Sequence, residues 1–456
     1  MPDRSTIFAL SSGRPPAAIA VVRVSGPQAS VALEKLIGRV PEPRKAALVR
    51  VRDPANGETI DEALALWFPG PQSETGEDVA ELQLHGGHAV VASVLDMLGA
   101  IPGCRLAEPG EFTRRAFEAG RLDLTAVEGL GDLIAAETPA QRRQAFRQLK
   151  GLIGDHAEAW RRRLIEALAL VEARIDFSDE ADVPEDLVGP ALHAAQQLRS
   201  EIAVILADGR RGERLREGLV VAIAGPPNAG KSTLFNRLAR REAAIVSPYA
   251  GTTRDIIEVH LDLDGYPVTL LDTAGIRDSS EPIEQEGMRR ARERAAAADV
   301  VLWVVDAGEV GERSGQHHLG SGVSEVWLVE NKIDLIGKKA SSGDRPPKDE
   351  YKFIYLTSAG QGDGVEALAT GLAGYARSFF AAAESGIVTR ARHRRALENT
   401  VSALDRALAE GAKTGEREEL IAEELRAAAM VLGRLTGRVD VEDILDVIFR
   451  DFCIGK

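Results

Sequence analysis

Four short segments with the residue types of a nucleotide site follow one another in the middle of this 456-residue chain. They read GPPNAGKS at 225–232, GTTRD at 251–255, DTAG at 272–275 and NKID at 331–334. A glycine-rich loop can present backbone N–H groups to phosphate oxygens, while hydroxyl and carboxylate groups can hold Mg²⁺. In this order, the four segments together predict GTP as the nucleotide, Mg²⁺ as the metal and phosphate hydrolysis as the reaction.

The first segment lies where a phosphate-binding loop must lie, between a strand and a helix. Residues 219–224 are apolar and β-branched, which predicts a buried strand, and 234–240 continue with helical periodicity. Lys231 would reach the β- and γ-phosphates, and the Ser232 hydroxyl would lie on Mg²⁺. The alternative is a glycine-rich turn with an exposed lysine. The nucleotide contacts predicted here are Asn228, Ala229, Gly230, Lys231, Ser232 and Thr233.

The later segments follow further apolar runs that predict a parallel sheet with intervening helices. Asp272 would hold Mg²⁺ through water, and the N–H of Gly275 would sense the γ-phosphate. The Asp334 carboxylate can accept hydrogen bonds from N1–H and the 2-amino group of guanine, a donor pair that adenine lacks. The predicted strands are 267–271, 300–305, 326–329 and 353–356. The predicted contacts are Asp272, Thr273, Ala274, Gly275, Asn331, Lys332, Asp334, and Ser358 with Ala359 closing over the base.

The hydrolytic residues depart from the pattern of Ras, in which a glutamine follows the glycine of the third segment. Ile276 occupies that position and cannot orient water, but an acidic stretch that includes Glu284 follows it. A carboxylate there could orient the attacking water. Arg254 and Arg277 are candidates for an arginine finger, although solvated arginines are the commoner case. The Asn228 side chain offers an oxygen to a cation that could neutralise transition-state charge, or it serves only the turn.

Composition favours a multidomain cytoplasmic protein. A net charge of −14 argues against a nonspecific nucleic-acid coat. Two cysteines, Cys104 and Cys453, cannot build a disulfide framework and suggest a reducing compartment. The sequence shows neither a secretory signal nor an apolar stretch of the roughly 20 residues that a membrane span needs, so we expect no membrane association.

Periodicity divides the chain into an α+β N-terminal domain and a helical domain into which an α/β P-loop G domain of the Ras type is inserted. In the first domain, 19–24, 62–68 and 79–85 predict strands and 89–98 predicts a helix. An acidic stretch at 176–186 separates two long helical patterns. The expected boundaries are 1–119, 120–216 for the first helical part, 217–380 for the G domain and 381–456 for the second helical part.

The whole chain resembles the MnmE (TrmE) family of tRNA modification GTPases. Beyond the four nucleotide segments, the resemblance rests on the C-terminal FCIGK at 452–456 and on an N-terminal block. That block contains RVSG at 23–26, TGED at 75–78, HGG at 85–87 and PGEF at 109–112.

The resemblance implies a K⁺-activated GTPase whose G domains meet in a homodimer. In the family K⁺ stands where an arginine finger would, Thr253 would be the second Mg²⁺ ligand beside Ser232, and Glu284 would orient the water. Lys231 completes the catalytic set. The loop implied to wrap K⁺ and GTP comprises Ser247, Pro248, Tyr249, Ala250, Gly251, Thr252 and Thr253. The implied K⁺ ligands are Asn228, Ser247, Tyr249 and Thr252.

The resemblance also implies that the N-terminal domain binds a 5-formyl- or methylene-tetrahydrofolate as one-carbon donor. The folate positions fall on Arg23, Glu81, Arg121 and Lys456, the third being often lysine in the family. Taken from the residues alone, Glu81 is better explained as an edge-strand carboxylate facing water. Cys453 is a candidate catalytic nucleophile because it lies near Lys456, but a lone cysteine is also a common small core residue.

Two functions compete at this point. One is a GTPase that, with a FAD-dependent partner of the MnmG (GidA) family, adds a carboxymethylaminomethyl-type group to C5 of the wobble uridine, position 34 of tRNA. The other is a regulatory switch similar to Era or EngA, which would have no use for a folate domain. Candidate tRNA contacts are the basic clusters 161–163 and 210–211 and the arginines Arg390, Arg392, Arg394 and Arg395.

Overall fold

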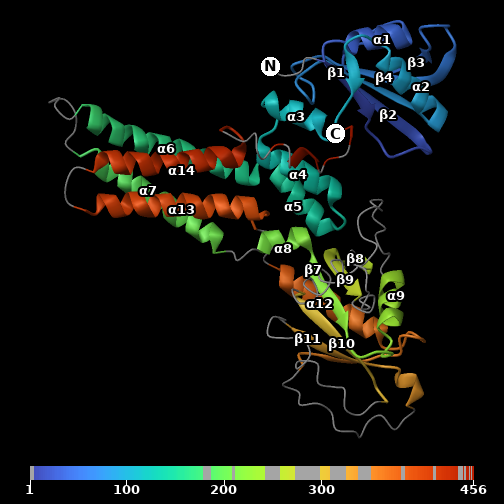
Figure 1. Cartoon of the computed structure of the whole chain (residues 1–456), viewed down its shortest axis with the longest axis vertical. Helices are drawn as coiled ribbons and strands as arrows, with labels where there is room; N and C mark the ends of the chain where they lie inside the picture. The colour runs from blue at the N-terminus through green and yellow to red at the C-terminus, as the bar shows by residue number, and fades with distance from the viewer. Residues whose placement is uncertain are drawn as a thin grey trace, which may run out of the picture. The chain divides into compact units, whose positions relative to one another are not determined.

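The computed structural model divides the chain into two compact units (Figure 1). One comprises Met1–Gly131, Gln148–Gln196 and Ser402–Lys456, and the other Asp132–Arg147 and Gln197–Val401. The structure describes residues 5–177, 186–207, 211–241, 257–272, 298–308, 325–336, 351–381, 386–413, 417–439, 445, 448–450, 452, 454 and 455.

The first unit contains a six-stranded sheet in the order β3-β4-β5-β2-β1-β6. All neighbours are antiparallel except β1 and β6. Buried and exposed residues alternate along β4, and α1 and α2 cover the buried face, where the apolar core lies. The predicted strands and helix are confirmed. The bounds are β1 Thr6–Leu10, β2 Ala17–Ser25, α1 Ala29–Ile37, β3 Ala47–Arg52, β4 Thr59–Phe68, β5 Val79–Gly86, α2 His88–Gly99 and β6 Cys104–Leu106.

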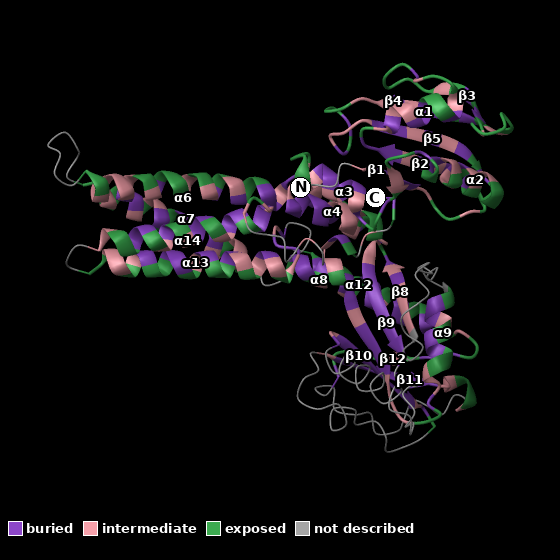
Figure 2. Cartoon of the chain, turned by 45° about the horizontal axis from the view of Figure 1, so that its top comes forward, coloured by how far each residue is buried: buried purple, intermediate pink, exposed green. Residues whose placement is uncertain are grey.

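Helices make up most of the rest of this unit, and four of them, at 124–135, 139–149, 188–206 and 391–411, cross the boundary to the second unit. In α6, Leu152–Asp176, the buried residues recur at helical spacing, among them Ile153, Trp160 and Leu164. This stripe packs along α14, Glu418–Thr436 (Figure 2). None of the described helices is long and apolar enough to cross a membrane. The remaining bounds are α3 Glu111–Glu118, α4 Leu124–Ala135, α5 Pro139–Leu149, α7 Val188–Leu206 and α13 Ala391–Gly411.

Two residues of the C-terminal tail, Ile454 and Gly455, lie against the N-terminal domain. Ile454 forms an antiparallel bridge with Pro109. Gly455 adopts a positive φ of 98°, and a Cβ there would lie only 2.3 Å from the Leu10 carbonyl oxygen. The tail therefore follows the end of β1 so closely that a side chain at Gly455 would not fit.

The second unit contains a six-stranded sheet in the order β12-β11-β10-β7-β9-β8. The predicted strands are confirmed, but the sheet is mixed rather than parallel, because the edge strand β8 runs antiparallel to β9. The bounds are α8 Arg211–Glu217, β7 Leu219–Ala224, α9 Lys231–Arg241, β8 Ile257–Leu263, β9 Tyr266–Asp272, β10 Val300–Asp306, β11 Val326–Asn331, β12 Ile354–Leu356 and α12 Val365–Phe380.

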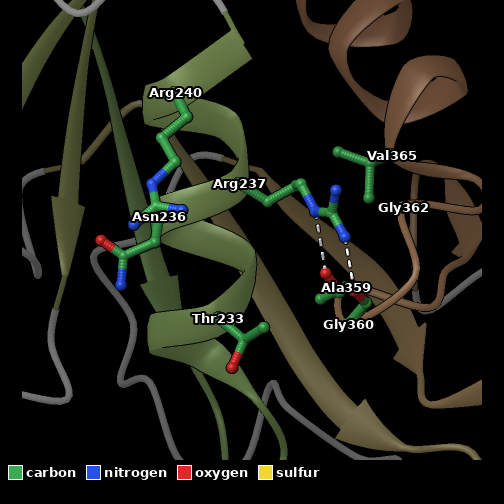
Figure 3. Close-up of a pocket in the computed structure, with 8 residues that line it drawn as sticks. All are labelled: Thr233, Asn236, Arg237, Arg240, Ala359, Gly360, Gly362 and Val365. Atoms are coloured by element: carbon green, nitrogen blue, oxygen red, sulfur yellow. Dashed lines mark hydrogen bonds between the residues drawn. The ribbon is translucent and has the colours of Figure 1, made fainter.

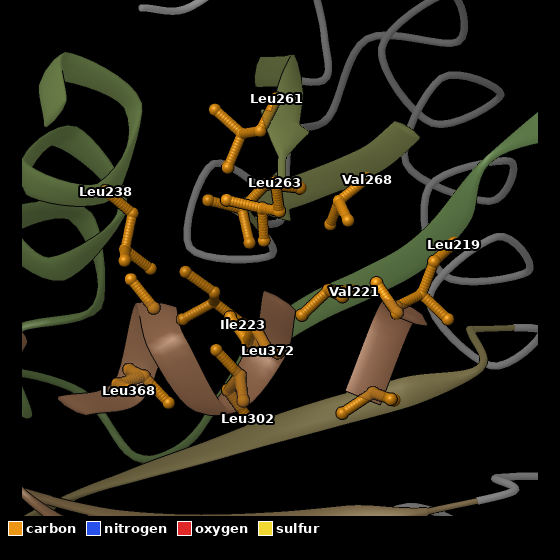
Figure 4. Packing of buried hydrophobic residues seen from close by; sticks show 14 of the residues in the cluster. Leu219, Val221, Ile223, Leu238, Leu261, Leu263, Val268, Leu302, Leu368 and Leu372 are labelled. Carbon is orange, nitrogen blue, oxygen red and sulfur yellow. The ribbon is translucent and has the colours of Figure 1, made fainter. Parts of the chain in front are cut away.

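The core of this unit lies between the sheet and the helices α9 and α12 (Figure 4). Val221 and Ile223 of β7 and Leu302 of β10 meet Leu238 of α9 and Leu368 of α12 in one cluster. Alternate residues of β7 and β10 are buried in different clusters, and burial of both faces of these strands explains their continuous apolar runs. The core thereby fixes the strand ends from which the site residues emerge.

We predict that Leu302→Ala destabilises the second unit by about 2–5 kcal/mol, because it opens a cavity in a fully buried position. Urea unfolding followed by tryptophan fluorescence, to which Trp303 and Trp327 of this unit contribute, measures the change. Val204→Ala, at a position 73% exposed, is the control and should leave stability nearly unchanged. Equal stability of Leu302→Ala and the unaltered protein would show that this core does not hold the unit together.

Candidate nucleotide-binding site

The phosphate-loop segment connects β7 to α9 by a turn that only glycines can make. Gly225 has a φ of 143°, and a Cβ there would lie 2.0 Å from the Val304 carbonyl oxygen. Gly230 has a φ of 93°, and its Cβ would lie 2.3 Å from the Asn331 side-chain nitrogen. Both glycines therefore allow close backbone approach, as a loop that wraps phosphates requires.

Lys231 folds back over this loop. Its ammonium donates hydrogen bonds to the carbonyl oxygens of Gly225 (2.9 Å) and Pro226 (2.7 Å). Burial lowers the pKa of the Lys231 ammonium, and the charge of Asp272 opposes this shift. Asp272 ends β9 as a buried residue, so the structure brings these two predicted site residues together.

The residues around this lysine fit a Mg²⁺ site. Ser232 and Thr233 are exposed in the first turn of α9, where the helix N-terminus favours bound phosphate. A hydroxyl at Ser232 and a carboxylate at Asp272 are the oxygen ligands that Mg²⁺ prefers. Asn228 is also exposed and has a left-handed φ of 66°, which agrees with turn chemistry and leaves its amide on the loop surface.

Asn331 is buried and joins the phosphate end of the site to the base end. Its Nδ2 donates to the Ala229 carbonyl oxygen at 2.8 Å. Its Oδ1 accepts from the backbone N–H of Ala359 at 2.9 Å and from the Thr357 hydroxyl at 3.2 Å. The sequence predicted Asn331 as a nucleotide contact; in the structure its side chain holds two loops together.

Lys332 and Asp334, which follow Asn331 in the fourth nucleotide segment, are less buried than Asn331. Asp334 is exposed in the short 3₁₀ helix Ile333–Leu335, where its carboxylate can meet a base. Lys332 has a left-handed φ of 62° and donates to the Asp306 carboxylate at 2.9 Å. The hydrogen bond from Lys332, with one from the Gly308 N–H, holds the pKa of Asp306 below its ordinary value.

Sequence reasoning missed Thr357 and Asp306. Asp306 carried a usable signal, since it ends β10 at the same sheet edge as Asp272 and Asn331. Thr357 carried none, because a threonine after a short strand is ordinary. Ser358 and Ala359 follow β12 as predicted and are buried.

Several predicted site residues lie outside the described residues, so their roles stay predictions. These are Ser247, Pro248, Tyr249, Ala250, Gly251, Thr252, Thr253, Thr273, Ala274, Gly275, Glu284, Cys453 and Lys456.

In the first unit, two of the predicted folate residues pair with each other. Arg23 of β2 and Glu81 of β5 are register partners, and Arg23 Nε donates to Glu81 Oε1 at 3.0 Å. Arg23 also contacts Glu74 at 2.6 Å, and its guanidinium lies 5.8 Å from the centroid of the Phe112 ring. The edge-strand interpretation of Glu81 is wrong, because β5 lies inside the sheet and the carboxylate is paired. Arg121 is exposed after α3.

Two arginines of the predicted tRNA-binding clusters form ion pairs within the second unit. Arg390 contacts Asp132 at 2.6 Å, and Arg394 contacts Glu213 at 3.0 Å. Their charges are thus partly neutralised, so they offer less to a phosphate backbone than the sequence suggested.

We predict that Asn331 and Asp334 have separable roles. Asn331→Ala should destabilise the nucleotide-free protein by about 2–4 kcal/mol, because it leaves a buried carbonyl and a buried N–H without their partner. Asp334→Ala should keep that stability, because the Asp334 side chain is exposed. It should lose affinity for GDP, because the predicted carboxylate contact with guanine is removed. Urea unfolding and equilibrium binding of GDP measure the two effects. A destabilised Asp334→Ala variant with unchanged GDP affinity would contradict this division.

Comparison with known proteins covers the chain from end to end. The model of the N-terminus of the GTP-binding protein TrmE matches residues 6–121, and that of the MnmE helical domain matches 124–453. The tRNA modification GTPase MnmE of Bradyrhizobium sp. strain ORS 278 is 58% identical over all of both chains. That of Parvibaculum lavamentivorans is 54% identical over 99% of this chain and all of the relative.

Among solved structures, the G domain of the FeoB iron transporter of T. maritima is 28% identical and covers 35% of this chain and 98% of its own. Its TM-score of 0.26 gives this likeness no weight. The full-length relatives and the two family models carry the assignment, and by them the chain belongs to the MnmE (TrmE) family of tRNA modification GTPases.

Proposed function

We propose that this protein is a K⁺-activated GTPase that acts in tRNA modification with a FAD-dependent partner of the MnmG (GidA) family. The reaction adds a carboxymethylaminomethyl-type group to C5 of uridine 34 and uses 5-formyl- or methylene-tetrahydrofolate as the one-carbon donor. The observation that carries the GTPase part is the Asn331 bridge between phosphate loop and base loop. Full-length similarity to proteins named tRNA modification GTPase MnmE supports the tRNA part.

Lys231 and Asp272 support the hydrolytic role. Lys231 donates its two hydrogen bonds to carbonyl groups of the phosphate loop. Phosphate oxygens can therefore replace these carbonyl groups as acceptors for the Lys231 ammonium without a change of fold. Mg²⁺ would be held by Ser232 and Thr253, with Asp272 acting through water, and would neutralise charge on the phosphates. In this proposal Glu284 orients the attacking water.

A K⁺ site at Asn228 agrees with the exposed, left-handed position of this residue in the phosphate loop. A side-chain oxygen there can join ligands from Ser247, Tyr249 and Thr252. The cation would then supply the positive charge that an arginine finger supplies in other GTPases.

The proposed folate site is supported by the cluster around Arg23. The guanidinium, two carboxylates at Glu74 and Glu81 and the Phe112 ring present charge beside an aromatic surface. Ile454 and Gly455 lie against the same unit, so the tail can bring Cys453 and Lys456 to it. We propose Arg121 as the fourth folate contact.

We also propose a homodimer formed through the N-terminal sheet. Leu48 and Leu64 are register partners on the outer face, and both side chains are exposed, Leu48 by 71%. Ile19 of β2 is exposed as well. Apolar side chains gathered on one sheet face favour association. The protein would act in the cytoplasm, and we retain the boundaries 1–119, 120–216, 217–380 and 381–456 as proposed domains.

We predict that K⁺ raises the rate of GTP hydrolysis on the order of 100-fold over Na⁺ at equal ionic strength, because the cation stabilises transition-state charge. Asn228→Ala should lose this response, whereas Asn236→Ala, an exposed asparagine on α9, should keep it. Steady-state phosphate release measures both. Equal rates in the two salts would remove the K⁺ assignment and favour a switch that awaits an external activator.

We predict that Glu284→Ala lowers the rate of hydrolysis roughly 10²- to 10⁴-fold while GTP affinity stays unchanged, because only water orientation is lost. Glu286→Ala is the matched control and should hydrolyse GTP normally. Single-turnover hydrolysis and equilibrium binding separate the two steps. Full turnover by Glu284→Ala would exclude this residue from the mechanism. With the partner and tRNA present, the variant should also fail to modify uridine.

A further inference from the structure

Arg237 ties the helix that begins at the phosphate loop to the loop that follows β12. It lies on α9, six residues after Lys231, and its side chain points to the backbone of that loop (Figure 3). Arg237 Nε donates to the Ala359 carbonyl oxygen at 3.1 Å, and a terminal nitrogen donates to the Gly360 carbonyl oxygen. One planar guanidinium thus holds two successive carbonyl groups in a fixed orientation.

The loop formed by residues 357–364, here called the base loop, is closed on itself. The Ser358 N–H donates to the Asp363 carbonyl oxygen at 2.9 Å, and the Gly362 N–H donates to the Ser358 carbonyl oxygen at 2.6 Å. Gly364 has a φ of 74°, and a Cβ there would lie 1.9 Å from the Leu356 carbonyl oxygen. A loop with these constraints moves as one piece, so its position depends on what holds it from outside.

Ala359 is held from both sides of its backbone. Its N–H donates to Asn331, which also binds the phosphate loop, and its carbonyl oxygen accepts from Arg237. The guanidinium lies against Gly362, where a Cβ would be 3.3 Å from an Arg237 nitrogen. Asn331 belongs to the nucleotide segments of the sequence, whereas Arg237 belongs to none of them.

The hydrogen bonds of Arg237 border an open cavity between α9 and the base loop, with a volume of 740 Å³. Thr233, Asn236, Arg240 and Val365 also line it. Figure 3 shows Arg240 and Asn236 directed away from Ala359, while Arg237 spans the gap. Since water can enter this cavity, we expect the two bonds to have a moderate effect rather than to hold the fold together.

We propose that Arg237 is a positioning residue for base recognition, which sets the distance between α9 and the base loop and so slows nucleotide release. This inference rests on the proposed contacts of Ser358 and Ala359 with guanine. Arg237 itself touches neither base nor phosphate in this account. Because the base loop is far from the γ-phosphate in the proposed site, release of GDP and of a non-hydrolysable GTP analogue should depend on Arg237 equally.

The test is the dissociation rate of a fluorescent GDP from the full-length protein, measured by stopped flow with excess unlabelled GDP. Arg237→Ala should release GDP roughly 5- to 30-fold faster, the effect of losing one or two partly exposed hydrogen bonds. Association should change little. Arg237→Lys should be intermediate, since an ammonium cannot hold both carbonyl groups as a planar fork does. Arg240→Ala, the control on the same helix, should release GDP at the unaltered rate.

Unaltered GDP release from Arg237→Ala would overturn the proposal, as would an equal acceleration in Arg240→Ala. A large drop in the melting temperature of nucleotide-free Arg237→Ala, with no rescue by lysine, would make the residue structural and would also overturn it. Asp334→Asn tests the base site itself. Its amide should favour xanthine over guanine nucleotides, because an NH₂ can donate to the C2 carbonyl of xanthine. Failure of that exchange would refute the base site, whereas success beside an unaltered Arg237→Ala would refute only Arg237.

Discussion

The amide of Asn331 is the constraint on which the nucleotide site depends. It is only 2% exposed and satisfies an acceptor in the phosphate loop and two donors in the base loop. The phosphate loop follows β7 and the base loop follows β12, and these two strands are separated in the sheet by β10 and β11. Asn331 is the last residue of β11. A buried amide whose partners are all protein groups is costly to disturb. The two ends of the site are therefore held in register without any nucleotide.

Close backbone approach also holds the phosphate loop in place without nucleotide. At Gly225 and Gly230 there is no room for a Cβ, so the loop lies directly against β10 and Asn331. The Lys231 ammonium donates to two carbonyl groups of the loop, those of Gly225 and Pro226. Binding of phosphate then exchanges hydrogen bonds rather than creating order, which limits the conformational entropy that nucleotide binding must overcome.

Local patterns predicted most of this architecture, and long-range contacts account for the rest. The β7 run at 219–224 was predicted to the residue. β8 was missed although Asp264 and Gly265, both with positive φ, form the two-residue turn that typically joins antiparallel strands. Polar residues in β8 hid its half-buried face. Glu81 was misplaced at a sheet edge because strand order is not encoded locally. Arg237 could not be assigned, since its partner Ala359 is 122 residues away.

The central claim, that the base loop is positioned before nucleotide arrives, can be tested by hydrogen exchange on the nucleotide-free protein. The backbone N–H groups of Thr357, Ser358, Ala359 and Gly362 all have protein acceptors. A peptide that covers 357–364 should therefore exchange slowly without nucleotide and change little when GDP is added. Rapid exchange that slows only with GDP would mean that the nucleotide orders the loop, and would contradict this account.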